Sequence, residues 1–98
     1  MVFARDITFK EISVDDYLEQ YDAIDPMGHV IGYVRAKRGY CDVYCPDCGG
    51  NDLVYDTDFG YLWGGFPSDD EREKHFNRIK ECIAAWCNEH PGVYGSTD

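Results

Sequence analysis

Two cysteines in the middle of the chain are spaced for metal binding. The segment from Cys45 to Gly49 reads Cys-Pro-Asp-Cys-Gly, a turn in which two thiolates face one tetrahedral ion while glycine lets the backbone fold beneath the sulfurs. A closed site needs two more ligands, and Cys87 and His90 offer them from one face of a helix. We therefore predict a zinc ion held by Cys45, Cys48, Cys87 and His90, which would stabilise a small fold rather than catalyse a reaction.

The same cysteines also have a purely structural interpretation. In it, Cys82 and Cys87 are small core hydrophobes, and Cys45 and Cys48 only occupy a turn. An odd total of five cysteines argues against a disulfide framework. A redox role for the CxxC pair is disfavoured, because such pairs open a helix after a strand, whereas the glycines here continue a turn.

No other residue pattern points to catalysis. The three histidines are scattered, and the sequence contains no nucleophile elbow, phosphate-binding loop, zinc-protease motif or dinucleotide fingerprint. We therefore expect a protein that is not an enzyme.

Charge is distributed along the chain in blocks. The sequence has 19 carboxylates against 9 Lys and Arg, a formal net charge of -10. Most of the carboxylates lie between residues 11 and 34 and between residues 39 and 71, where there is no Lys or Arg. Such a surface repels nucleic acid and anionic membranes and attracts basic protein surfaces. The alternative is that the acids serve solubility.

Length and composition predict one folded domain over residues 1–98, with a flexible tail at 92–98. A content of 44% hydrophobic and 15% aromatic residues is too apolar for a disordered acidic chain. The N-terminal residues contain no apolar run of signal-peptide length, and no segment approaches the roughly 20 apolar residues of a membrane helix. We therefore expect a cytoplasmic protein.

Periodicity predicts the elements that position these residues. Ile7 and Phe9 alternate with polar residues as in a short opening strand. Residues 13–24 place apolar side chains at helical spacing after an acidic cap, which predicts a short helix with the acids from Asp15 to Asp22 on its outer face. Alternation and glycine turns predict antiparallel strands near 29–37, 40–45, 53–57 and 61–66. The capping box at Ser68 and the apolar stripe through Trp86 predict a long helix to about residue 89.

The predicted fold class is therefore α+β. We expect an antiparallel sheet of three to four strands, on which a short N-terminal helix and a long C-terminal helix pack.

One stretch resembles a known family. Residues 17–26 read Tyr-Leu-Glu-Gln-Tyr-Asp-Ala-Ile-Asp-Pro, which is similar to the opening of small phage anti-CRISPR proteins directed at type I-F surveillance complexes. Further similarities are the helix start from Pro67 to Asp70 and the pair Trp86-Cys87. The segment with Cys41, Cys45 and Cys48 has no counterpart in that family. The resemblance implies an inhibitor without enzymatic activity that docks on the surveillance complex and stops it from binding target DNA.

The charge pattern and the resemblance agree on the kind of partner. A complex that binds foreign DNA presents Lys and Arg to phosphates, and an acidic protein can occupy those groups first. We expect no direct contact with nucleic acid or membrane. The alternative function is a small cytosolic zinc-binding module with a structural or adaptor role. The residues predicted to bind the partner are carboxylates and aromatic anchors: Asp15, Asp16, Glu19, Asp22, Asp56, Asp58, Tyr61, Trp63, Asp69 and Asp70.

Overall fold

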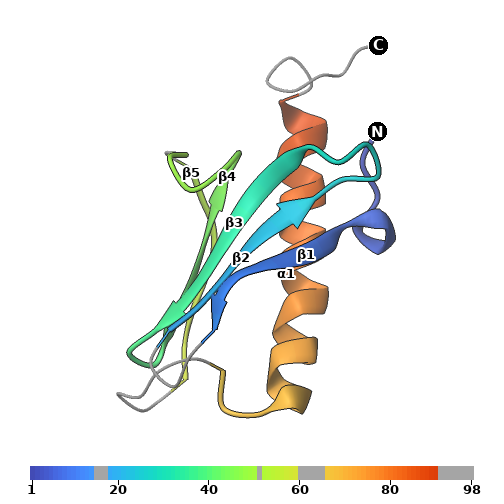
Figure 1. Cartoon of the computed structure of the whole chain (residues 1–98). Coiled ribbons are helices and arrows are strands. Elements are labelled where there is room, and N and C mark those ends of the chain that lie inside the picture. The colour runs from blue at the N-terminus through green and yellow to red at the C-terminus, as the bar shows by residue number, and fades with distance from the viewer. Residues whose placement is uncertain (15–17, 51, 60–65, 91–98) are drawn as a thin grey trace.

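The computed structural model of the chain describes residues 1–14, 18–50, 52–59 and 66–90. These residues form an α+β fold in which a five-stranded antiparallel sheet packs against one long helix (Figure 1). The strands are neighbours in the sheet in the same order as in the sequence, so the sheet is a meander. The elements are η1 (Ala4–Asp6), β1 (Thr8–Val14), β2 (Leu18–Ile24), β3 (Val30–Lys37), β4 (Tyr40–Cys45), β5 (Asp52–Asp58) and α1 (Asp69–Glu89).

Most of the elements predicted from periodicity are confirmed. The strands near 29–37, 40–45 and 53–57 are β3, β4 and β5, and the opening strand is the start of β1. The long helix is α1, and its N-cap Ser68 accepts a hydrogen bond from the N–H of Glu71, as the capping box requires. Most of the strand predicted near 61–66, and all of the predicted tail, lie outside the described residues.

The helix predicted for residues 13–24 is wrong, because these residues contribute the end of β1 and all of β2. In β2, the alternate residues Glu19, Tyr21 and Ala23 are buried, which is the period of a strand. β2 lies between β1 and β3, so both of its edges form ladder hydrogen bonds that a short surface helix would not have. The sheet therefore has five strands, more than the three to four expected.

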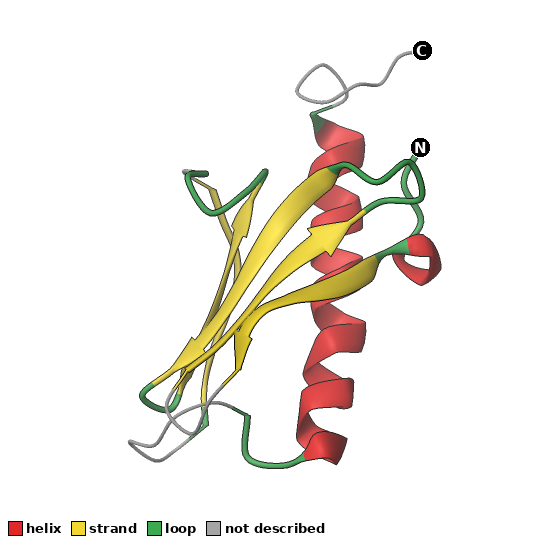
Figure 2. Cartoon of the chain, in the orientation of Figure 1, coloured by secondary structure: helices red, strands yellow, loops and turns green. Residues whose placement is uncertain are grey.

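The hydrophobic core lies between one face of the sheet and α1. Figure 2 shows α1 lying along that face. Ile79 and Ile83 of α1 are fully buried, and a Cβ on Gly32 of β3 would stand only 2.9 Å from Cδ1 of Ile83. Near the start of α1, the Phe76 ring packs against Phe9 and Tyr21, with ring centroids 4.3 Å and 5.1 Å apart. No helix among the described residues is long and apolar enough to span a membrane.

Hydrogen bonds fasten the second half of α1 to the strands and to the N-terminal segment. The indole Nε1 of Trp86 donates to Asp52 of β5 at 2.6 Å. Asn88 accepts from the N–H of Val2 at 2.8 Å and donates to the Val2 carbonyl at 3.0 Å. These polar contacts fix the position of the helix along the sheet, which apolar packing alone specifies less sharply.

A buried ion pair holds the start of α1 to the beginning of β2, an inner strand of the sheet. The carboxylate of Glu19 is 5% exposed and accepts two hydrogen bonds from the guanidinium of Arg72, at 2.8 Å and 2.9 Å. It also accepts from the Tyr21 hydroxyl at 2.5 Å and from the N–H of Phe66 at 3.0 Å. Both oxygens of this buried carboxylate are thus satisfied, as a charge out of water requires.

The environment of Glu19 keeps it ionised. Burial acts to raise the pKa of this carboxyl, but the hydrogen bonds from Arg72, Tyr21 and Phe66 and the charge of Arg72 outweigh it, so the pKa is lower than usual. Burial and the bond to this carboxylate raise the pKa of Tyr21, which therefore remains a hydrogen-bond donor.

Replacing Glu19 with glutamine is expected to lower the free energy of unfolding by roughly 3 kcal/mol, because Arg72 then loses its buried counter-charge. Urea denaturation at neutral pH measures this change. The matched control is Asp69→Asn, which removes the other carboxylate that contacts Arg72 and is 97% exposed. The control is expected to change stability little.

The same comparison repeated at acid pH gives a second readout. The pKa of Glu19 is lower in the folded protein than its ordinary value of 4.5, so its contribution is complete above about pH 4.5 and is lost as the pH falls through the folded value. The wild type should therefore lose stability more steeply than Glu19→Gln below pH 4.5. Equal acid slopes, or an equal loss in Asp69→Asn at neutral pH, would contradict the role of the pair.

Candidate functional site

The sheet has two chemically different faces. Gly32, Val34 and Ala36 of β3 are buried on the side covered by α1. The residues that alternate with them belong to the opposite side, which we call the outer face. On the outer face the side chains of neighbouring strands are mostly polar or aromatic: Gln20 and Asp22 of β2, Tyr33, Arg35 and Lys37 of β3, Tyr40, Asp42 and Tyr44 of β4, and Asp56 and Asp58 of β5.

The structure separates the acids that were predicted to bind a partner. The expectation that Glu19 lies on an exposed surface is wrong, because it is buried against Arg72. Asp22 is half-buried in β2. The acids Asp56 and Asp58 are exposed on β5, and Asp69 and Asp70 are exposed at the start of α1. Four of the predicted residues lie outside the described part of the chain: Asp15, Asp16, Tyr61 and Trp63.

Carboxylates gather on the outer face at β5. Asp56 lies directly opposite Asp42 of β4 in the antiparallel register, and Asp58 lies two residues further along β5. Like charges placed directly opposite each other destabilise a sheet. Arg35, opposite Asp42 on its other side, donates to that carboxylate at 3.3 Å and offsets part of the repulsion. We call Asp42, Asp56 and Asp58 the acidic strip.

Asp42 was not among the residues predicted to bind a partner, although the sequence of the β3–β4 hairpin indicates its position. The two-residue turn at Arg38 and Gly39 sets the register of β3 and β4, and that register places Arg35 opposite Asp42. The position of Asp56 beside Asp42 depends in addition on the length of the connection between β4 and β5, which alternation does not reveal.

The predicted zinc ligands are brought together only in part. Cys45 and Cys87 are both buried, and burial together with the nearby charge of Cys87 raises the pKa of the Cys45 thiol to about 12. Cys48 is exposed in the turn after β4. His90 stacks on the Trp86 ring with centroids 4.2 Å apart. In the described ranges, no three His, Cys, Asp or Glu side chains form a group that would hold a metal ion.

The turn that contains Cys48 has internal support. The carboxylate of Asp47 accepts from the N–H of Gly49 at 2.9 Å, and the Asp47 carbonyl accepts from the N–H of Gly50 at 2.8 Å. A Cβ on Gly50 would stand 2.1 Å from the carbonyl oxygen of Cys45, so the backbone path requires glycine there. The aspartate and the second glycine of this motif therefore have a role in the turn itself, with or without a metal ion.

A short chain of polar side chains links α1 to β5. His75 lies with Nδ1 2.7 Å from the Tyr55 hydroxyl and with Nε2 3.6 Å from the carboxylate of Glu71. Burial raises the pKa of Tyr55 and lowers that of His75, although the charge of Glu71 acts in the opposite direction on His75. A nucleophilic tyrosine needs a lowered pKa, so this chain is better suited to fastening the helix than to catalysis.

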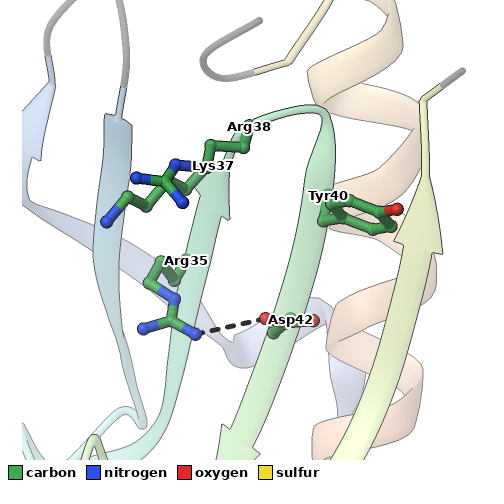
Figure 3. Close-up of a pocket in the computed structure, with 5 residues that line it drawn as sticks. All are labelled: Arg35, Lys37, Arg38, Tyr40 and Asp42. Atoms are coloured by element: carbon green, nitrogen blue, oxygen red, sulfur yellow. Dashed lines mark hydrogen bonds and ion pairs between the residues drawn. The ribbon is translucent and has the colours of Figure 1, made fainter. Parts of the chain in front are cut away.

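A hollow of about 510 Å³ lies on the outer face at the β3–β4 hairpin. Its lining residues are Arg35 and Lys37 of β3, Arg38 of the turn, and Tyr40 and Asp42 of β4 (Figure 3). Arg38 has a φ of 56° and Gly39 a φ of 80°, the pattern of a type I′ turn, in which the first position is usually asparagine, aspartate or glycine. An arginine there is held in a left-handed conformation that it adopts at an energetic cost.

Comparison with known proteins gives no relatives: no protein-family model, no curated protein sequence and no solved structure matches this chain.

The zinc site stays a prediction, with Cys48 as its most informative residue. If zinc is bound, protein purified without chelator should contain about one zinc per chain, and Cys48→Ser should lower stability by several kcal/mol. Because Cys48 is exposed, such a loss cannot come from a disturbed core. Thermal unfolding with and without chelator measures it, and Cys82→Ser is the control. Protein that contains no zinc and melts identically after chelator treatment would contradict the prediction.

Relieving the backbone at Arg38 should stabilise the hairpin. Arg38→Asn is expected to raise the free energy of unfolding by about 1 kcal/mol, because asparagine adopts a positive φ more readily. The control is Lys37→Asn, which places the same residue at a strand position and should not stabilise the protein. Chemical denaturation measures both variants. A loss of stability in Arg38→Asn would show that the arginine side chain makes contacts that outweigh the strain.

Proposed function

We propose that this protein is an inhibitory binding protein that docks its acidic strip on the basic, nucleic-acid-binding surface of a partner. The observation that supports this most is the placement of Asp42 and Asp56 directly opposite each other on β4 and β5. A facing pair of carboxylates disfavours folding by up to about 1 kcal/mol. Such a pair is useful where a basic partner supplies the missing positive charge.

The geometry of the strip suits a row of basic side chains. Residues directly opposite in an antiparallel pair have Cβ atoms about 5 Å apart, and side chains two residues apart along a strand are separated by about 7 Å. Asp42, Asp56 and Asp58 therefore present three carboxylates within the reach of two or three Lys or Arg side chains. The formal charge of -10 adds long-range attraction, which speeds the encounter with a basic partner.

The strip also lies beside a strand edge. Among the described residues, β5 is the last strand of the sheet and pairs with β4. Charged side chains on an edge strand protect it against pairing with other copies of the chain. The same negative charges attract a positively charged partner. They therefore both prevent pairing between copies of the chain and favour binding to a basic protein.

The specific partner that we propose is a type I CRISPR surveillance complex. Its DNA-binding surface must present Lys and Arg to phosphates, and occupying them prevents DNA from binding. The resemblance to anti-CRISPR proteins supports this choice, although residues 18–24 of that stretch form β2, whose alternate side chains are buried. Glu19, Tyr21 and Ala23 of the similar stretch therefore belong to the interior of the fold, and we propose the acidic strip as the docking surface.

A zinc-binding structural module is the second candidate function. The observation in its favour is that Cys45 and Cys87, distant in the sequence, are both buried in the same core cluster. A metal ion there would connect the end of β4 to the end of α1. This candidate predicts a role in assembly rather than in inhibition.

The test is a DNA-binding assay on a purified type I-F surveillance complex, with the protein added before or after target DNA. Protein added first should prevent DNA binding at a ratio of at least one copy per complex, while protein added second should have little effect. The double variant Asp56→Asn/Asp58→Asn should inhibit about tenfold less well. Its control is Glu73→Gln/Glu81→Gln, which removes the same charge from exposed positions of α1 and should still inhibit.

Three outcomes would contradict the proposal. Equal losses in the two double variants would mean that only total charge matters. Full inhibition by the β5 variant would place the docking surface away from the strip. Inhibition of DNA cleavage without any effect on DNA binding would assign the protein to the recruited nuclease instead.

A further inference from the structure

The outer face carries a concentration of positive charge that the acidic composition hides. Three of the 9 Lys and Arg residues lie within four positions, in the run Arg35-Ala36-Lys37-Arg38. Alternation along β3 and the tight turn that follows bring all three side chains to one hollow. Figure 3 shows their charged ends on the same side of the hairpin. The bases on α1 are instead interleaved with acids.

Among the residues that the structure describes, carboxylates neutralise only part of this charge. Of the described residues that line the hollow, Asp42 is the acid, and it pairs with Arg35, whose side chain is 41% exposed. Within the described ranges, neither Lys37 nor Arg38 has a carboxylate within ion-pair distance. Counting the described residues alone, about two positive charges face the hollow, which favours an anion that brings more than one negative charge.

An aromatic ring borders the same hollow. Tyr40 lies opposite Lys37 in the β3–β4 register and is 50% exposed. In Figure 3 its ring lies on β4, across the hairpin from the three cationic ends. An exposed tyrosine ring offers a flat surface on which a nucleobase can stack, with a contribution of about 1 to 3 kcal/mol. The volume of about 510 Å³ is in the range of small-molecule sites.

We propose that this hollow binds a free nucleoside phosphate. The phosphates contact Lys37, Arg38 and Arg35, and the base stacks on Tyr40. Guanidinium groups donate paired hydrogen bonds to phosphate oxygens, and the lysine adds a compact charge. The proposal also explains why an arginine occupies the positive-φ position of the turn, where its side chain joins the other two cations at the rim of the hollow.

The surroundings select a small ligand over a nucleic acid strand. Asp58 lies opposite Tyr40, and Asp56 lies opposite Asp42, so carboxylates border the hollow toward β5. A polymer that extended past Tyr40 would place its phosphates against these carboxylates, whereas a single nucleotide ends before them. The proposed phosphate contacts use neither Asp56 nor Asp58, so these two carboxylates of the acidic strip can be varied without removing a ligand contact; the strip and the hollow meet only where Asp42 pairs with Arg35.

The experiment is isothermal titration calorimetry of the full chain at low salt. The ligands are ADP, adenosine, inorganic pyrophosphate and a short thymidine oligonucleotide, each titrated separately. ADP should bind most tightly, and Lys37→Gln/Arg38→Asn should weaken it at least about tenfold because two phosphate contacts are lost. The matched control Lys74→Gln/Arg78→Gln removes the same charge from exposed positions of α1 and should bind ADP like the wild type. Tyr40→Leu should lower the affinity for ADP but leave the affinity for pyrophosphate unchanged.

Thermal unfolding of every variant distinguishes lost binding from lost folding. The proposal is overturned if the wild type does not bind ADP, if both double variants lose equal affinity, or if ADP and pyrophosphate bind equally well. Tighter binding of the oligonucleotide than of ADP would also overturn it, in favour of a nucleic acid strand. Inhibition by the acidic strip is tested separately, with the Asp56/Asp58 variant, so either proposal can fail without the other.

Discussion

The ion pair between Glu19 and Arg72 is the contact on which the arrangement of sheet and helix depends. The carboxylate is almost fully removed from water, so it needs every one of its four hydrogen bonds, and these come from β2, from Phe66 and from the first turn of α1. A buried charge with a specific partner penalises alternative packings more than apolar contacts do. The ion pair thereby fixes the start of α1, while the hydrogen bonds of Trp86 and Asn88 fix its other end.

The sequence predicts well those elements whose signals are local. The turn at Arg38 and Gly39 and the alternation around it are sufficient for β3 and β4, and the capping box at Ser68 is sufficient for the start of α1. It fails at β2, because Val14, Leu18 and Tyr21 have helical spacing, whereas the residues that β2 buries, Glu19, Tyr21 and Ala23, include a charged one and so show no apolar alternation. The burial of Glu19 is hidden for another reason: its partner, Arg72, is 53 residues away.

The acidic strip and the basic hollow share a boundary on the outer face. Arg35 lines the hollow and also pairs with Asp42 of the strip at 3.3 Å. A ligand that draws the guanidinium toward itself weakens its pairing with Asp42, and a partner that takes Asp42 leaves Arg35 more available to an anion. Binding at the two proposed sites is therefore coupled through one residue, and the coupling acts equally in both directions.

The order of elements along the chain also determines when the protein can fold during its synthesis. Among the described elements, the five strands of the meander precede α1, so they leave the ribosome before the helix that covers their apolar face. Until then Val34, Val43 and the uncompensated carboxylate of Glu19 face water. Folding is thus held back until Arg72, Ile79 and Ile83 emerge, and a ribosome that stalls before them leaves a nascent chain with an uncovered sheet, a substrate for chaperones.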